Sequence, residues 1–227
     1  MNEKQLFPTR LYLRKFLNTF FPRFLFGLSP SRYWAQRHWG SQNKGDIHGF
    51  DNYFVFHPRM PILFSELRSR VQLENSILDL GCNCGYYLSL LKKEGYKNLF
   101  GIDISTVAIQ YGKEQLDLSD VDLTVGSFEE ILPKIVAEGT RFDLVYTLGA
   151  TIELVHPSFD IIGHMCKISK RFIILIISES GHSYPRFWEY EFNRNGFLMV
   201  KCIRPYDGKY LGENVESLDS LLVFQRI

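Results

Sequence analysis

The chain of 227 residues has few cysteines and no long apolar run, and each absence excludes a class of protein. Its four cysteines include one close pair, Cys82 and Cys84, without a second Cys or His pair at zinc-ligand spacing. We therefore expect no metal site and reduced thiols, as in a cytoplasmic protein. No segment approaches the roughly 18 apolar residues of a membrane-spanning helix. Arginines interrupt the apolar N-terminal stretch, which argues against a signal peptide.

The net charge is only +1, but the charges are unevenly distributed. Residues 1–45 hold eight lysines and arginines against one glutamate, a charge of +7, so the remaining residues carry −6. Apolar side chains recur at helical spacing between Leu13 and Phe20. Two hypotheses follow for residues 1–28: a helix packed on the domain, or a helix in peripheral contact with the inner face of a membrane. The acidic remainder argues against a nucleic-acid partner.

Turn-forming residues between positions 30 and 58 suggest a basic, aromatic leader or lid segment over 1–58 and a domain over 59–227. The domain alternates strand-like and helix-like segments, which predicts a doubly wound, mostly parallel α/β sheet with helices on both faces. The connection before the last strand is too short for a crossover helix, so that strand should run antiparallel. Seven strands are predicted at 76–80, 98–104, 122–128, 142–150, 171–178, 198–205 and 220–227. Helices are predicted at 85–95, 105–116, 129–139, 156–169 and 184–196.

A turn of small residues follows the first strand, in the string Asp79-Leu80-Gly81-Cys82-Asn83-Cys84-Gly85. In a doubly wound sheet this turn lies at the carboxyl edge, where ligands bind. Glycine lets the backbone approach a ligand closely, and Asn tolerates a left-handed conformation. Asp103 ends the next strand, where a carboxylate can accept hydrogen bonds from ribose hydroxyls. A dinucleotide motif is disfavoured, because Asn83 and Tyr86 stand where it needs glycine.

The pattern acid-hydrophobe-Gly-x-Asn-x-Gly resembles that of the class I S-adenosylmethionine-dependent methyltransferases, over roughly residues 75–180. The resemblance implies a Rossmann-like fold, S-adenosylmethionine as cofactor and methyl transfer as the activity. It also implies a set of cofactor-binding residues: Arg37, Asp79, Gly81, Cys82, Asn83, Gly85, Asp103, Ile104, Ser127, Phe128 and Leu148.

Each implied residue has an expected role. The turn would wrap the methionine part of the cofactor, and Ile104, Ser127 and Phe128 would flank the adenine. Leu148 would lie beside the transferable methyl group. The string from Tyr33 to Arg37 resembles a leader of small-molecule methyltransferases, in which the arginine faces the cofactor carboxylate. A solvated arginine is the alternative.

Methyl transfer from a sulfonium requires alignment, exclusion of water and, for a hydroxyl acceptor, a general base. Two catalytic candidates follow the fourth strand, His156 and Glu153, and the unperturbed pKa of a histidine lies nearer neutrality. The alternative for His156 is a cap of the helix predicted over 156–169. Tyr33, His182 and Tyr184 are expected to line the acceptor pocket.

A small-molecule acceptor is the preferred hypothesis, with a hydroxyl of a sugar, surface-polysaccharide or secondary-metabolite intermediate as the methylated group. Two alternatives remain. The first is a binding or scaffold protein of this fold without turnover of its own. The second is a nucleic-acid methyltransferase, although no Asn-Pro-Pro-Tyr-like string follows the fourth strand.

Overall fold

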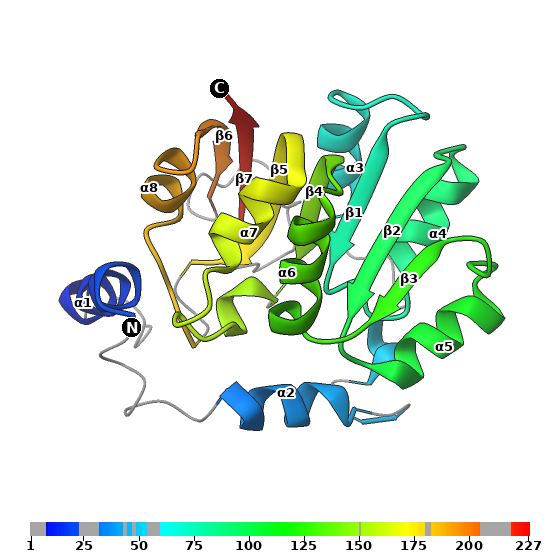
Figure 1. Ribbon diagram of the computed structural model, residues 1–227, viewed down its shortest axis with the longest axis horizontal. Coiled ribbons are helices and arrows are strands. Elements are labelled where there is room, and N and C mark those ends of the chain that lie inside the picture. The colour runs from blue at the N-terminus through cyan, green and yellow to red at the C-terminus, as the bar shows by residue number, and fades with distance from the viewer. Residues whose placement is uncertain are drawn as a thin grey trace.

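The computed structural model describes residues 8–22, 32–42, 45–46, 49–53, 60–149, 151–179, 183–204 and 219–227. Within these ranges one seven-stranded sheet runs through the molecule in the order β3-β2-β1-β4-β5-β7-β6 (Figure 1). The strands are β1 (Ser76–Leu80), β2 (Asn98–Asp103), β3 (Asp122–Val125), β4 (Phe142–Leu148), β5 (Ser169–Ser178), β6 (Phe197–Ile203) and β7 (Asp219–Arg226).

The direction of the strands confirms the predicted mixed sheet. Strands β1 to β5 run parallel to one another, whereas β7 pairs antiparallel with both β5 and β6. Adjacent residues of β1 face opposite sides of the sheet, with Ile77 in one apolar cluster and Leu78 in the other. Because both faces are buried, the central strands read as continuous apolar runs.

Helices cover both faces of the sheet (Figure 1). Apolar side chains of α3, α4 and α5 pack on one face, and those of α6, α7 and α8 pack on the other. The bounds are α3 (Met60–Arg68), α4 (Tyr86–Lys93), α5 (Thr106–Gln115), α6 (Phe128–Glu138), α7 (Ile161–Ile168) and α8 (Trp188–Asn193). The elements outside these layers are α1 (Pro8–Phe20), α2 (Arg32–Gly40) and the short 3₁₀ helices η3 (Phe50–Tyr53) and η4 (Ile152–Leu154).

Two predicted helices begin later than expected. Helix α7 starts at Ile161 rather than 156, because Asp160 is its N-cap and accepts a hydrogen bond from the Gly163 N–H at 2.9 Å. The idea that His156 caps this helix is therefore wrong. Helix α8 starts at Trp188 rather than 184, and an extended segment precedes it.

The leader lies in two places on the domain. Helix α1 rests beside the segment that precedes α8, and α2 crosses below the carboxyl ends of β1, β2 and β4 (Figure 1). No helix in the described part of the chain is long and apolar enough to cross a membrane. The division of the chain at residue 58 stays a prediction.

Candidate functional site

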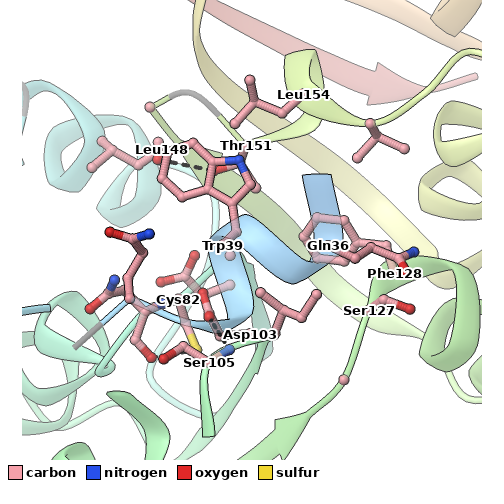
Figure 2. Close-up of a pocket in the computed structure, with 18 of the residues that line it drawn as sticks. Gln36, Trp39, Cys82, Asp103, Ser105, Ser127, Phe128, Leu148, Thr151 and Leu154 are labelled. Atoms are coloured by element: carbon pink, nitrogen blue, oxygen red, sulfur yellow. Dashed lines mark hydrogen bonds between the residues drawn. The ribbon is translucent and has the colours of Figure 1, made fainter. Parts of the chain in front are cut away.

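A cavity of about 470 Å³ opens at the carboxyl edge of the sheet, in the size range of small-ligand pockets. Its walls come from the turn after β1, the ends of β2, β3 and β4, and the loop through η4. Helix α2 contributes Gln36 and Trp39 on one side, and Figure 2 shows the Trp39 ring between the Asp103 side and the Leu148–Thr151 side. The topology thus brings segments that are far apart in the sequence to one hollow.

The turn after β1 begins at a glycine that no other residue can replace without strain. Gly81 has a φ of +79°, and its N–H donates to the Ile102 carbonyl at 2.8 Å. A Cβ at this position would lie 2.4 Å from Cγ2 of Thr151. The turn therefore runs against the segment after β4 and leaves its backbone facing the cavity.

Asp103 is held in place by two backbone donors. The N–H of Asn83, which has a φ of +52°, donates to Oδ2 at 2.8 Å, and the N–H of Ser105 donates to Oδ1 at 2.8 Å. Each carboxylate oxygen keeps a further lone pair for a ligand. The side chain is half-buried, and desolvation raises its pKa. The result is an oriented acceptor pair at the tip of β2, suited to a diol.

The cavity is acidic. Asp79, Asp103 and Glu129 line it, and no lysine or arginine does so among the described residues. Asp79 accepts a hydrogen bond from the Tyr146 hydroxyl at 2.7 Å, and burial raises the pKa of its carboxyl to about 7. Such a site favours a cationic ligand over a pyrophosphate.

An apolar slot with one polar group lies beside Asp103. Ile104 and Phe128 line it together with Ser127, at the N-terminus of α6. The Ser127 N–H donates to the Glu130 carboxylate at 3.2 Å, whereas the buried Ser127 Oγ has no hydrogen-bond partner among the residues described. A buried hydroxyl without a partner on the cavity wall suits a ligand with a polar edge, such as an adenine.

The part of the cavity wall that follows η4 holds a fixed histidine. Nδ1 of His156 lies 2.8 Å from Ser158 Oγ and accepts from the Ser158 N–H at 3.1 Å. The imidazole meets the Tyr184 ring edge-on, with 5.2 Å between centroids. The neighbouring Val155 carbonyl accepts from the buried Arg186 guanidinium at 3.1 Å. Two sides of the ring are thus occupied, and its orientation is set.

Glu153, the other catalytic candidate, lies away from the cavity wall. It is completely buried and does not line the cavity; its carboxylate accepts from the N–H of Thr151 at 3.1 Å and of Ser178 at 2.8 Å. Burial raises its pKa to about 7. Its carbonyl accepts from the Tyr184 N–H at 2.9 Å. Glu153 therefore ties together three segments behind the acceptor end.

Two of the implied cofactor residues also lie elsewhere. Arg37 is exposed, and α2 turns Gln36 and Trp39 toward the cavity instead. Gly85, with a φ of +76°, lies behind the turn, where a Cβ would come within 2.7 Å of Leu118 Cδ1. The nine others line the cavity: Asp79, Gly81, Cys82, Asn83, Asp103, Ile104, Ser127, Phe128 and Leu148.

Some of the residues predicted for catalysis and for the acceptor pocket lie on the cavity wall. Tyr184 and His156 line the cavity. Residue 182 lies outside the described residues, and so does the side chain of Tyr33. The prediction missed Gln36 and Trp39, although their spacing of three on a helix places them on one face.

Known proteins resemble the chain in sequence. A family model described as "Methyltransferase domain" matches residues 74–203. Ribosomal protein L11 methyltransferase of Paraburkholderia phymatum is 33% identical over 89 residues, which make up 39% of this chain and 28% of that protein. EEF1A lysine methyltransferase 2 of Homo sapiens is 29% identical over 112 residues, 45% of this chain and 48% of that protein. The chain thus covers less than half the length of these two relatives.

Solved methyltransferases share the fold. Magnesium protoporphyrin IX methyltransferase from Synechocystis PCC 6803, solved with bound SAM, aligns with a TM-score of 0.59 at 16% identity and covers 100% of this chain and 98% of that one. A putative sarcosine dimethylglycine methyltransferase from Galdieria sulphuraria also has a TM-score of 0.59 at 16% identity, over 73% and 84% of the two chains. At this identity the likeness concerns the fold alone.

The donor set of the cavity fits S-adenosylmethionine. An oriented carboxylate suits the ribose, and the acidic wall suits the sulfonium and ammonium charges. The slot suits the adenine, because the Ser127 hydroxyl there has no hydrogen-bond partner in the part of the chain that the structure describes. The family model spans more than half of the chain, and the sheet order is that of the resembled fold. The chain therefore belongs to the class I S-adenosylmethionine-dependent methyltransferase family.

Proposed function

We propose that the chain transfers a methyl group from S-adenosylmethionine to a hydroxyl of a small molecule, such as a sugar or secondary-metabolite intermediate. The observation that carries this proposal is the position of His156. Among the described residues it is the one imidazole on the cavity wall, and it comes from the loop after η4 rather than from the ends of β2 and β3. A base there serves a hydroxyl acceptor, whose proton must leave during transfer.

The side chains of the cavity would divide the work. Asp103 would hold the ribose hydroxyls, and Ser127 and Phe128 would hold the adenine. When bound, the cofactor supplies a methyl group already activated by the sulfonium. His156 would act as the base in the tautomer that carries its proton at Nδ1 and donates it to Ser158 Oγ, so that the unprotonated Nε2 takes the proton of the acceptor hydroxyl. In this tautomer Nδ1 no longer accepts from the Ser158 N–H. Leu154 and Val155 would exclude water from this end.

The cover formed by α2 supports a small acceptor. Trp39 and Gln36 reach over the hollow from a helix that crosses the carboxyl edge of the sheet (Figures 1 and 2). A folded protein acceptor would have to insert a single long side chain past this cover. The names of the two sequence relatives point to protein acceptors, so a protein amine is the second candidate.

Methyl-labelled S-adenosylmethionine can separate these acceptors. The chain is incubated with a low-mass filtrate of a cell extract, with its protein fraction and with its RNA fraction, and purified ribosomal protein L11 serves as a defined protein acceptor. We expect enzyme-dependent label in the low-mass filtrate alone. Label that enters only the protein fraction or L11 would refute the small-molecule proposal in favour of the second candidate.

Replacement of His156 by glutamine should slow methyl transfer by about 100- to 10,000-fold, because a positioned general base contributes roughly that factor. The affinity for S-adenosylmethionine should stay unchanged, since the residues proposed to hold the cofactor come from the turn after β1 and the ends of β2 and β3. Turnover and calorimetric affinity are measured side by side. His164→Gln is the matched control, because His164 stacks on Phe159 and does not line the cavity. Equal rates for the two variants would exclude His156 as the base.

The affinity for S-adenosylmethionine should rise with pH through about 7. Burial raises the pKa of the Asp79 carboxyl to about 7, so the free protein loses this negative charge below that pH. A cationic ligand favours the ionised carboxylate, and its binding therefore releases a proton below pH 7 and none above. Affinity should fall by up to about tenfold per pH unit on the acidic side.

Calorimetry in buffers of different ionisation enthalpy measures the released proton directly. Asp79→Asn keeps an acceptor for the Tyr146 hydroxyl and should bind weakly without this pH dependence. A wild-type affinity that is flat between pH 6 and 8 would rule out the charge interaction at Asp79.

A further inference from the structure

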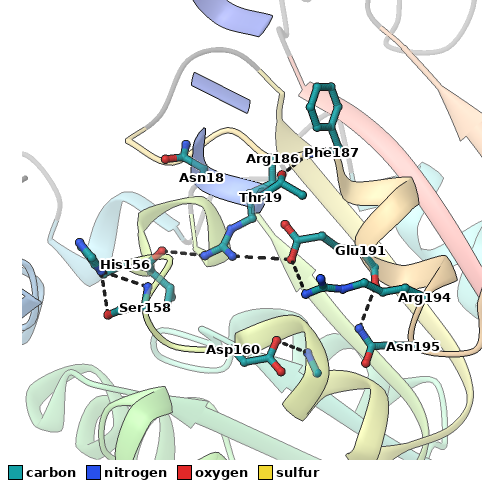
Figure 3. A network of polar contacts seen from close by, with 12 residues as sticks. Asn18, Thr19, His156, Ser158, Asp160, Arg186, Phe187, Glu191, Arg194 and Asn195 are labelled. Carbon is teal, nitrogen blue, oxygen red and sulfur yellow. Dashed lines mark hydrogen bonds and ion pairs between the residues drawn. The ribbon is translucent and has the colours of Figure 1, made fainter. Parts of the chain in front are cut away.

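Helix α1 has one face fixed to the domain. Asn18 and Thr19 are buried; the Asn18 amide donates to the Pro185 carbonyl at 2.8 Å, and the Phe187 N–H donates to Thr19 Oγ1 at 3.1 Å. Lys15 pairs with Glu179 at 3.5 Å. Figure 3 shows Asn18 and Thr19 beside Arg186 and Phe187. These contacts set which face of α1 points away from the domain.

That outward face is apolar and aromatic. Tyr12 is 63% exposed, Leu13 54% and Phe21 52%. Phe16 and Phe20, whose ring centroids are 5.1 Å apart, are exposed between them. Exposed apolar side chains that are contiguous, unlike scattered ones, mark an interaction site.

Helix α8 extends the same surface. The ring of Tyr190, itself exposed, lies 5.1 Å from the Phe20 ring. Arg194 is 5.9 Å from the Tyr190 ring, and Arg10 is exposed near the start of α1. The aromatic face is therefore the set Tyr12, Leu13, Phe16, Phe20, Phe21 and Tyr190, bordered by these two arginines.

We propose that this aromatic face binds the surface of an anionic lipid bilayer. Bulky apolar side chains next to arginines are the composition of helices that lie in the membrane interface, with tyrosine rings at the headgroup level. Anionic headgroups complement the leader, which carries +7 over residues 1–45. A second copy of the chain is the less suitable occupant, because it would bring two equally basic leaders together.

Contacts connect α1 to the segments that carry His156 and Tyr184. Arg186 stands in the sequence between Pro185 and Phe187, which both bond to α1. Its guanidinium donates to the carbonyl of Val155, the residue before His156 (Figure 3). Arg14 of α1 also donates to the Ser183 carbonyl, next to Tyr184. In the membrane-bound protein, the part of the cavity lined by His156 and Tyr184 would therefore lie on the same side of the domain as α1.

Vesicle co-sedimentation of the full chain tests the proposal. Vesicles of phosphatidylglycerol mixed with phosphatidylcholine should bind the chain, pure phosphatidylcholine should bind it weakly, and high salt should reduce binding. Leu13→Ser with Phe21→Ser should weaken binding by roughly tenfold or more, from the lost burial of two apolar side chains. Both side chains are more than half exposed, so the fold should be retained.

The control is Leu198→Ser with Val200→Ser, which alters exposed apolar residues on β6 away from this face. It should bind vesicles like the wild type. Thermal melting and cofactor affinity verify that both double variants are folded. Equal vesicle binding by the two variants, or none by the wild type, would overturn the proposal. So would a concentration-dependent dimer, seen by sedimentation velocity, that only the Leu13/Phe21 variant loses, because the occupant would then be a second copy.

Discussion

Replacement of Asp103 by alanine is expected to lower the affinity for S-adenosylmethionine by about 100- to 10,000-fold. Two ribose hydroxyls lose their hydrogen bonds to a charged acceptor, and each such bond contributes roughly 1.5–3 kcal/mol. The N–H groups of Asn83 and Ser105 also lose their common acceptor, so the turn that faces the cavity is less well ordered. Calorimetric titration of the folded variant measures the effect.

Two further variants separate the carboxylate from general damage. Asp103→Asn keeps one carbonyl oxygen and should fall between the wild type and alanine. Asp122→Ala removes an exposed aspartate at the start of β3, away from the cavity, and should bind the cofactor normally. Wild-type affinity in Asp103→Ala would show that the cofactor does not use this carboxylate.

Replacement of Gly81 by alanine should destabilise the protein by about 2–5 kcal/mol and abolish cofactor binding. The left-handed backbone costs any other residue about 1–2 kcal/mol, and forced overpacking costs about 1–3 kcal/mol more. The overpacking arises because the new Cβ would lie 2.4 Å from Thr151 Cγ2. Urea unfolding monitors the free energy, and calorimetry monitors binding.

The chain offers a matched control for this strain. Gly139 has a φ of +73°, close to the +79° of Gly81, but nothing lies within 4 Å of its added Cβ. Gly139→Ala therefore measures the backbone cost alone and should be the milder variant. Thr151→Ser removes the clashing methyl group and should partly restore Gly81→Ala. Equal destabilisation by the two glycine variants would contradict the close packing of the turn after β1 against Thr151.

The sequence predicted the sheet and the ligand-facing turn after β1 because the determinants of both are local. Apolar runs bounded by turn residues mark β1, β2 and β5, and the serine at position 105 caps α5 by accepting from the Ala108 N–H at 3.2 Å. The turn after β1 is set by its own glycine and asparagine, and its position at the carboxyl edge follows from the parallel topology. Nine of the eleven implied cofactor residues consequently line the cavity.

The positions of the predicted residues that lie off the cavity wall depend on tertiary packing. The spacing within α2 cannot say which face meets the sheet, and packing turns Trp39 rather than Arg37 inward. Glu153 is three residues from His156, yet Glu153 lies within η4 with its side chain buried, whereas His156 follows η4 and lines the cavity. The sequence around Glu153 contains no pattern that predicts a buried carboxylate accepting from two backbone N–H groups.

The acceptor end shows the same limit. Proline at position 157 and the Asp160 cap delay α7, so the residues before it form a loop that can present His156. A continuous helix over 156–169 would have buried this loop in a regular element. The length of an apolar pattern predicts a helix, but the cap determines where the helix begins.

The most direct test of the cofactor site is a calorimetric titration of the unmodified chain with S-adenosylmethionine, beside one with NAD⁺. We expect one saturable site for S-adenosylmethionine and no binding of NAD⁺, whose pyrophosphate meets an acidic cavity without a described lysine or arginine on its wall. A folded chain that binds neither ligand, or that prefers NAD⁺, would contradict the assignment of this cavity.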